Sequence, residues 1–160
     1  MTPELVVYYR AMLRVGVGDA FYQAFNLALE EENPLSDLIL SLCSCISDAD
    51  AVVHILTEYL FEHKADDQEV YKLVVTDLME RVASGEVTRQ NVVAVLDEIA
   101  HTLDKCMERP WCYCVHLADH FDLCKDGMIS ENVFNLCFDA WFKHGQWLDV
   151  WELHREEVAQ

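Results

Sequence analysis

The stretch G-E-V-T-R-Q-N-V at residues 85–92 carries the signals that end one helix and begin the next. Gly85 can adopt the left-handed backbone conformation that often follows a helix, and Thr88 is a favourable N-cap for the helix after it. Val87 precedes the cap and can pack on an apolar residue one turn into that helix. A stretch of the same kind, G-M-I-S-E-N-V-F, occupies residues 127–134. We expect both stretches to join the two helices of a helical hairpin.

The rest of the chain shows the same preference for helices. Apolar residues recur at helical spacing, and no segment shows the alternation that is typical of a half-buried strand. Three prolines and five glycines are few for 160 residues, which argues against a loop-rich β protein. The pattern predicts an all-α fold, a single-domain bundle of about eight or nine antiparallel helices over residues 1–160, with helical-hairpin repeats as one form of it. The expected helices cover residues 2–14, 19–32, 35–45, 48–60, 66–84, 88–107, 111–123, 130–143 and 146–158.

The charge of the chain restricts its partners. Acidic residues outnumber basic residues by 29 to 11, which gives a formal net charge of -18 at pH 7, and both halves of the chain share the excess. A negative field repels nucleic-acid phosphates and anionic lipid head groups, whereas it speeds encounter with positively charged proteins. We therefore expect a cationic protein partner, with no direct binding to nucleic acid or to a membrane surface.

The cysteines and the apolar segments bear on location. Seven cysteines are an odd number, the chain is large for a disulfide-stapled miniprotein, and its beginning lacks the pattern of a signal peptide. The most apolar stretch, Leu38–Ile46, is about half as long as a bilayer-spanning helix. These features predict reduced thiols, a cytoplasmic location and no transmembrane segment.

The stretch R-P-W-C-Y-C-V-H-L-A-D-H-F-D-L-C at residues 109–124 has the composition of a metal site. Cys112, His116 and His120 lie at intervals of four residues and therefore share one face of a helix. Cys112 and His120 are nevertheless separated by about 12 Å along the helix axis, which is too far for them to share one zinc ion. His116, Asp119 and His120 resemble the H-x-x-E-H pattern of inverted zinc peptidases, with aspartate in place of glutamate. A metal-dependent hydrolase that uses these three residues is the alternative function, although we expect no metal and no cofactor.

Other short motifs point away from an enzyme. In the C-x-C pairs, Cys43 with Cys45 and Cys112 with Cys114, the side chains diverge by about 200° on a helix, so buried thiols explain them best. The stretch 122–133 has the outline of a calcium-binding loop but lacks oxygen ligands at its third and twelfth positions. No phosphate-binding glycine loop, dinucleotide fingerprint or nucleophile elbow is present. We therefore expect a protein that is not an enzyme.

Three of the four tryptophans lie near the C-terminus, at Trp141, Trp147 and Trp151. Large aromatic residues at helical spacing are typical of core packing, but tryptophans are also enriched at binding hot spots. A third hypothesis is therefore a helical scaffold or adaptor in which these residues form a subunit interface. The sequence leaves the oligomeric state open.

The carboxylates are the candidate binding residues, although charged side chains also serve simply to solvate a surface. If successive helices are antiparallel, the turns near residues 33, 64, 109 and 145 gather at one end of the bundle. The opposite end has acidic residues as well, so the preference is modest. The candidates at the first end are Glu30, Glu31, Glu32, Glu62, Asp66, Asp67, Glu69 and Glu108. The acidic residues of the opposite end, which are not candidates, are Asp48, Asp50, Glu86, Asp122, Asp126 and Glu131.

The segment E-E-N-P-L-S-D-L-I-L-S-L-C-S-C-I-S-D-A-D-A-V-V at residues 31–53 combines an apolar helix with a capped turn. Together with the small, acidic and helical character of the chain, it resembles the all-helical immunity proteins of bacterial polymorphic and contact-dependent toxin systems. The resemblance implies a cytoplasmic inhibitor that binds a cognate toxin domain, often a nuclease with a cationic cleft, and blocks access of the substrate. A positive cleft is what a nuclease needs to hold phosphate, so the charge of this chain points to the same partner.

Overall fold

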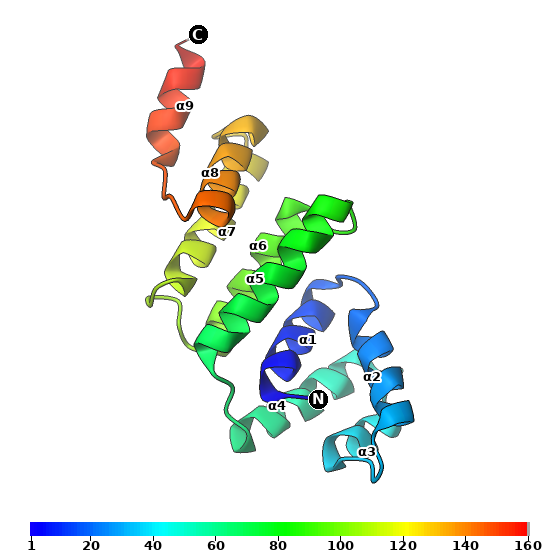
Figure 1. Ribbon diagram of the computed structural model, residues 1–160. Helices are drawn as coiled ribbons and strands as arrows, with labels where there is room; N and C mark the ends of the chain where they lie inside the picture. Colours follow the sequence, from blue (N-terminus) through cyan, green and yellow to red (C-terminus); the bar gives the residue numbers. More distant parts are fainter. Residues whose placement is uncertain (160) are drawn as a thin grey trace. The chain divides into compact units, whose positions relative to one another are not determined.

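The computed structural model describes residues 1–159, and every regular element in that range is an α-helix (Figure 1). The prediction of an all-α fold with about eight or nine helices is confirmed. Within these residues, no helix is long and apolar enough to cross a membrane. The described helices are α1 (Pro3–Val15), α2 (Ala20–Glu31), α3 (Asp37–Cys43), α4 (Ala49–Glu62), α5 (Asp67–Ser84), α6 (Arg89–Thr102), α7 (Trp111–Lys125), α8 (Glu131–His144) and α9 (Val150–Val158).

The chain divides into two compact units, of which the first comprises Met1–Leu73 and the second begins at Val74 and continues to the C-terminus. Helices α1 to α4 belong to the first unit, α6 to α9 belong to the second, and α5 contributes to both. The expectation that residues 1–160 form a single domain stays a prediction.

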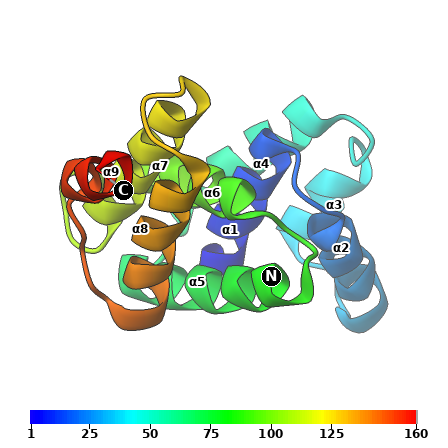
Figure 2. The same ribbon diagram turned by 90° about the horizontal axis from the view of Figure 1, so that it is seen from above.

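In the first unit, α1 packs against α2 and α4, and α3 packs against α2 and α4 (Figure 2). The interior of this unit is aliphatic, because Val6, Ile39 and Leu56 are fully buried on helices α1, α3 and α4. A polar contact also joins α1 to α4, since Nε of Arg10 donates a hydrogen bond of 2.8 Å to Oγ1 of Thr57. These contacts fix the positions of α3 and α4, which carry the candidate site.

In the second unit, α7 packs against α6 and α8, and α9 packs against α8. Trp111 begins α7 and is fully buried, together with aliphatic residues of α6 and α7. The last helix is also held by polar contacts, because Oε1 of Glu157 accepts hydrogen bonds from Oγ of Ser130 at 2.8 Å and Nδ2 of Asn132 at 3.2 Å. The N-terminus of α8 and the C-terminal end of α9 are therefore joined.

The two glycine-containing stretches form the same local structure, as their sequences predict. Gly85 and Gly127 have φ angles of 78° and 71°, the left-handed region that glycine enters without strain. In each stretch, the amide that follows the glycine donates a hydrogen bond of 2.9 Å to the carbonyl five residues earlier. Thr88 and Ser130 then cap the next helices, and the apolar residue before each cap is buried. The hinge chemistry is confirmed, whereas the interpretation as helical-hairpin repeats stays a prediction.

Two helix boundaries differ from the predicted ones by four residues or more, and the others lie within two residues. Helix α6 ends at Thr102, before the predicted end near Met107, because the chain turns at Asp104, which has a φ of 56°. Helix α9 begins at Val150, later than predicted, because Asp149 accepts hydrogen bonds from two amides of its first turn. Asp149 thus caps a shorter helix, and Asp104 adopts a left-handed conformation that aspartate enters more readily than most residues.

Thr88 offers a test of the hinge. Its Oγ1 accepts a hydrogen bond of 3.1 Å from the amide of Asn91, and its own amide donates one of 3.1 Å to Oδ1 of Asn91. We predict that Thr88→Ala lowers the free energy of unfolding by about 1 kcal/mol in urea denaturation. Thr76→Ala is the matched control, because Thr76 is exposed inside α5, where alanine favours the helix. Equal losses in the two variants would contradict the capping explanation.

Candidate functional site

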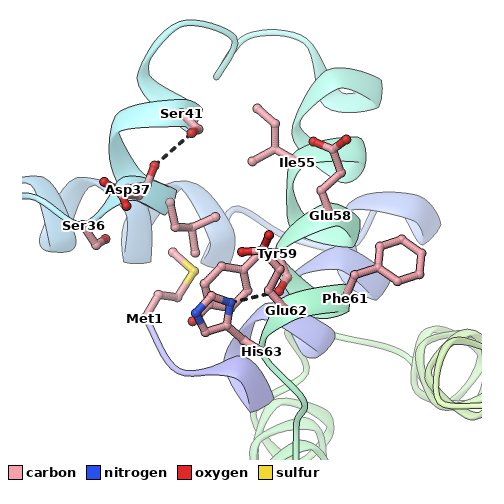
Figure 3. Close-up of a pocket in the computed structure, with 11 residues that line it drawn as sticks. Met1, Ser36, Asp37, Ser41, Ile55, Glu58, Tyr59, Phe61, Glu62 and His63 are labelled. Atoms are coloured by element: carbon pink, nitrogen blue, oxygen red, sulfur yellow. Dashed lines mark hydrogen bonds between the residues drawn. The ribbon is translucent and has the colours of Figure 1, made fainter.

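A groove of about 730 Å³ lies between α3 and α4 in the first unit (Figure 3). It follows directly from the local structure, because Ser36 caps the N-terminus of α3 and places the first turn of that helix opposite the last two turns of α4. We call it the α3–α4 groove. Its lining residues are Met1, Ser36, Asp37, Leu38, Ser41, Ile55, Glu58, Tyr59, Phe61, Glu62 and His63.

Part of the groove is apolar. Leu38 is buried, whereas Ile55 and Tyr59 are half-buried and extend from α4 toward α3 in Figure 3. The ring of Tyr59 stacks on that of His63, with the ring centroids 4.1 Å apart and the planes inclined by 6°. Burial, and next the charge of Glu4, raises the pKa of Tyr59, so this phenol is neutral at physiological pH. The groove therefore offers an apolar and aromatic surface.

Carboxylates surround this apolar surface. Asp37 lies on α3, and Glu58 and Glu62 lie one turn apart on α4. No lysine or arginine lines the groove, and none of these three carboxylates has a lysine or arginine salt-bridge partner within residues 1–159. The neighbour of Glu58 is Nε2 of His54 at 3.4 Å, which is a cation only when it is protonated. The N-terminal ammonium of Met1, which also lines the groove, lies 3.3 Å from Oε1 of Glu32. Asp37, Glu58 and Glu62 thus leave the groove with negative charge that no lysine or arginine of the described residues neutralises.

In the second unit, by contrast, several carboxylates have basic partners. Lysine and arginine side chains form salt bridges of 2.8 to 3.0 Å with them. These pairs neutralise much of the local charge, although exposed pairs add little to stability. The pairs are Asp77 and Glu86 with Arg81, Asp139 with Arg89 and Lys143, Glu108 with Lys105, and Asp122 with Lys125.

Two of the predicted binding residues lie at the α3–α4 groove. Glu62 lines it, and Glu32 contacts its edge, because Oε2 of Glu32 accepts hydrogen bonds from the hydroxyl and the amide of Ser36 at 2.7 and 3.1 Å. These hydrogen bonds are the main reason that the pKa of Glu32 is lowered. Glu30 and Glu31 are exposed at the end of α2 and do not line the groove.

Three further predicted residues, Asp66, Asp67 and Glu69, lie at the beginning of α5. Oδ1 of Asp66 accepts hydrogen bonds of 3.0 Å from two amides of the first turn, that of Glu69 included, so Asp66 caps the helix. In a capping box Glu69 would in turn accept a hydrogen bond from the amide of Asp66, but here Oε1 of Glu4 accepts it at 3.1 Å. This bond is the main cause of the lowered pKa of Glu4. Because Glu4 also acts on Tyr59, it links the start of α5 to the groove.

The remaining predicted residue, Glu108, belongs to the second unit and forms a salt bridge with Lys105 at 2.8 Å. The predicted gathering of these carboxylates at one end of the bundle stays a prediction. Sequence reasoning missed Asp37 and Glu58. Glu58 and Glu62 are four residues apart on one helix, and this spacing was the signal that could have found Glu58.

The alternative metal site lacks a third ligand. Nδ1 of His116 lies 3.7 Å from Oδ2 of Asp119, but His120 is 8% exposed and packs against Trp147, with ring centroids 5.3 Å apart. Nδ1 of His120 is buried and has no hydrogen-bond partner. In the described part of the chain, no group of three histidine, cysteine, aspartate or glutamate side chains is arranged to hold a metal ion. We find no geometric support for the hydrolase.

The C-terminal aromatic residues have two roles. Phe134 and Phe138 are buried in the second unit, as the core interpretation predicts. Trp147 packs against Tyr113 with ring centroids 5.1 Å apart, yet it is 36% exposed. Trp151 is 42% exposed on α9. These two tryptophans therefore keep accessible surface that a partner could cover.

Comparisons with protein-family models, curated proteins and solved structures found no match to this chain. The resemblance to immunity proteins accordingly stays a hypothesis. The candidate site depends on the shape and charge of the α3–α4 groove.

His120 and His101 predict opposite effects of pH. Burial, and next the charge of His116, lowers the pKa of His120 below its ordinary 6.5, so protonation favours the unfolded chain and stability falls as the pH drops below 6.5. The pKa of His101 is raised, first by a hydrogen bond to the carbonyl of Asp97 and next by the charge of the Asp97 carboxylate. Protonation of His101 therefore favours the folded chain and adds stability at low pH. We predict that His120→Leu flattens the loss of unfolding free energy between about pH 7 and pH 5, measured in urea. His101→Gln should steepen it, and an unchanged slope in His120→Leu would contradict the assignment.

The cysteines provide a second test. Burial raises the pKa of Cys114 to about 12 and that of Cys137 to about 11, whereas Cys43 is exposed. The predicted burial of the C-x-C thiols is therefore correct for Cys114 and wrong for Cys43, with Cys45 and Cys112 half-buried. We predict that iodoacetamide modifies Cys43 in the folded protein, while Cys114 and Cys137 react only after unfolding in urea. Peptide mass spectrometry measures this, and rapid native labelling of Cys114 would contradict the packing.

Proposed function

We propose that this chain is an acidic protein-binding inhibitor of the immunity type. It neutralises a cognate toxin domain, in our proposal a nuclease, by covering the cationic active site of that toxin. The observation that supports the proposal is the α3–α4 groove, where Asp37, Glu58 and Glu62 have no lysine or arginine partner among the described residues and lie beside an apolar surface.

A nuclease must hold phosphate groups, so its cleft has positive potential. An acidic protein can occupy such a cleft with carboxylates in the places where phosphates bind, and the substrate is then excluded. The net charge of -18 also acts at long range, because it steers the two proteins together before they touch. Inhibition in this proposal is by occlusion and needs no chemical step.

In this proposal, charge determines the association rate and apolar contact determines the residence time of the complex. Exposed salt bridges contribute about 0 to 1 kcal/mol each, so carboxylates mainly set the association rate. Residence time depends on apolar and aromatic anchors that are fully desolvated in the complex. Ile55 and Tyr59, which are half-buried in the groove, are the anchors that the structure offers beside the carboxylates.

The proposal includes a cytoplasmic site of action, because a nuclease toxin attacks nucleic acid inside the cell. The seven cysteines, which form no disulfide within the described residues, suit a reducing compartment. What supports the proposal is the groove and not the cysteines.

A helical adaptor is the second candidate, because Trp147 and Trp151 keep exposed aromatic surface in the second unit. In that case the tryptophans would form an interface between copies of the chain. The mass of the protein in solution distinguishes the two candidates, since a strict monomer removes the support for the adaptor.

Salt dependence tests the inhibitor. The protein is titrated against each basic toxin domain encoded next to its gene, by surface plasmon resonance and in a nuclease assay. We predict inhibition at equal molar amounts, with an association rate that falls at least about tenfold between roughly 50 and 500 mM salt. The dissociation rate should change by less than about threefold. Absence of binding to all of these domains at low salt would remove the basis of the proposal.

A further inference from the structure

We infer that the α3–α4 groove is the docking site for an arginine-bearing apolar segment of the partner protein, with the guanidinium held by Glu58 and Glu62. The inference rests on the proposed function in one respect, since it takes the partner to be a cationic protein. It goes further by naming the contact residues and the side chain that they bind.

The spacing of the two glutamates favours a guanidinium over an ammonium. Glu58 and Glu62 are four residues apart in α4, so their Cβ atoms are about 6 Å apart on one face of the helix. A guanidinium is planar and has five N–H donors, which lets it bridge two carboxylates at once, whereas the ammonium of lysine acts as a point charge. Asp37 lies across the groove on α3 and adds negative charge from the opposite wall (Figure 3).

Because the rest of the groove is apolar, the residues next to the arginine in the partner segment should be apolar as well. Leu38 is buried beneath the groove, and Ile55 and Tyr59 present half-buried apolar atoms. A volume of about 730 Å³ falls within the range of about 300 to 1,000 Å³ that is usual for pockets holding a whole ligand. The groove therefore fits a short segment with an arginine and adjoining aliphatic side chains, rather than a single side chain.

The negative charge of the groove also argues against anionic molecules and against a second copy of this chain as its ligand. A nucleic acid, an anionic lipid surface or a phosphate group would meet three carboxylates in the groove, where the one full cation of the lining, the N-terminal ammonium of Met1, is already paired with Glu32. A second copy of this chain has the same net charge of -18 and is repelled at long range. A cationic segment is the occupant that neutralises the groove.

The chain offers a matched control for local binding. Glu30 and Glu31 on α2 are exposed, as are Glu58 and Glu62, and they do not line the groove. The double variants Glu58→Gln with Glu62→Gln and Glu30→Gln with Glu31→Gln remove the same number of charges from the same unit. A difference between them measures the groove itself and not the overall field.

The test is an NMR titration of the full chain with a short peptide that alternates leucine and arginine. We expect the peptide to shift the resonances of Leu38, Ile55 and Tyr59. The same peptide with citrulline in place of arginine keeps the shape and loses the charge, and it should bind at least about tenfold more weakly. A lysine version should bind about threefold more weakly than the arginine peptide.

The variants are then titrated with the arginine peptide. We expect binding about tenfold weaker for the Glu58→Gln, Glu62→Gln protein and less than about twofold weaker for the Glu30→Gln, Glu31→Gln protein. Circular dichroism checks that both variants keep the helical fold. Equal weakening in the two variants, equal binding of the citrulline peptide, or shifts centred away from the groove would overturn the inference.

A toxin titration separates this inference from the proposed function. If a toxin domain binds the Glu58→Gln, Glu62→Gln protein as tightly as the unmodified protein, the inhibitor proposal stands and the groove is not its docking site. If no toxin domain binds the unmodified protein, the inhibitor proposal fails and the inference loses the partner on which it rests.

Discussion

The excess of carboxylates over basic side chains is the constraint on which the rest of this structure depends. With 29 acidic residues and 11 basic ones, most carboxylates cannot pair with a cation of the same chain. Some find backbone amides instead, because Asp48, Asp66 and Asp149 accept hydrogen bonds at the N-termini of helices, where the helix dipole also favours negative charge. Others pair with lysine or arginine in the second unit. Asp37, Glu58 and Glu62 of the α3–α4 groove have no lysine or arginine partner among the described residues, which is why they stand out as a candidate site.

The sequence predicts the fold well where the signals are local. Glycine followed by an N-cap identifies both hinges, and Gly85 and Thr88 have the conformation and the hydrogen bonds that their residue types favour. Prediction is weaker where a distant residue takes part. The amide of Asp66 is bonded to Glu4 and not to Glu69, because a carboxylate from α1 reaches it first in the folded chain. No local pattern around residue 66 contains that information.

The candidate site shows the same limit. The sequence identifies acidic residues near the turns, and Glu32 and Glu62 do lie at the groove. It does not reveal the groove, because a cavity requires the packing of α3 on α4, and this packing decides that Asp37 and Glu58 line the same cavity.

The histidines of α7 illustrate the reverse case, in which the sequence suggests a site that the fold does not form. Their spacing suits a metal site, but Trp147, which is distant in sequence, packs against His120 and leaves it buried, and no group of three possible ligands forms in the described residues.

The groove also links binding to stability. The groove exists only when α3 packs on α4, so the folded first unit presents a binding surface that the unfolded chain lacks. Natural proteins commonly give up some stability at functional sites, where the residues serve a partner and not the fold. A cationic segment that docks in the groove therefore binds the folded state alone. Binding must therefore stabilise the first unit, because a ligand of the folded state shifts the unfolding equilibrium in proportion to the logarithm of its concentration once the site is saturated.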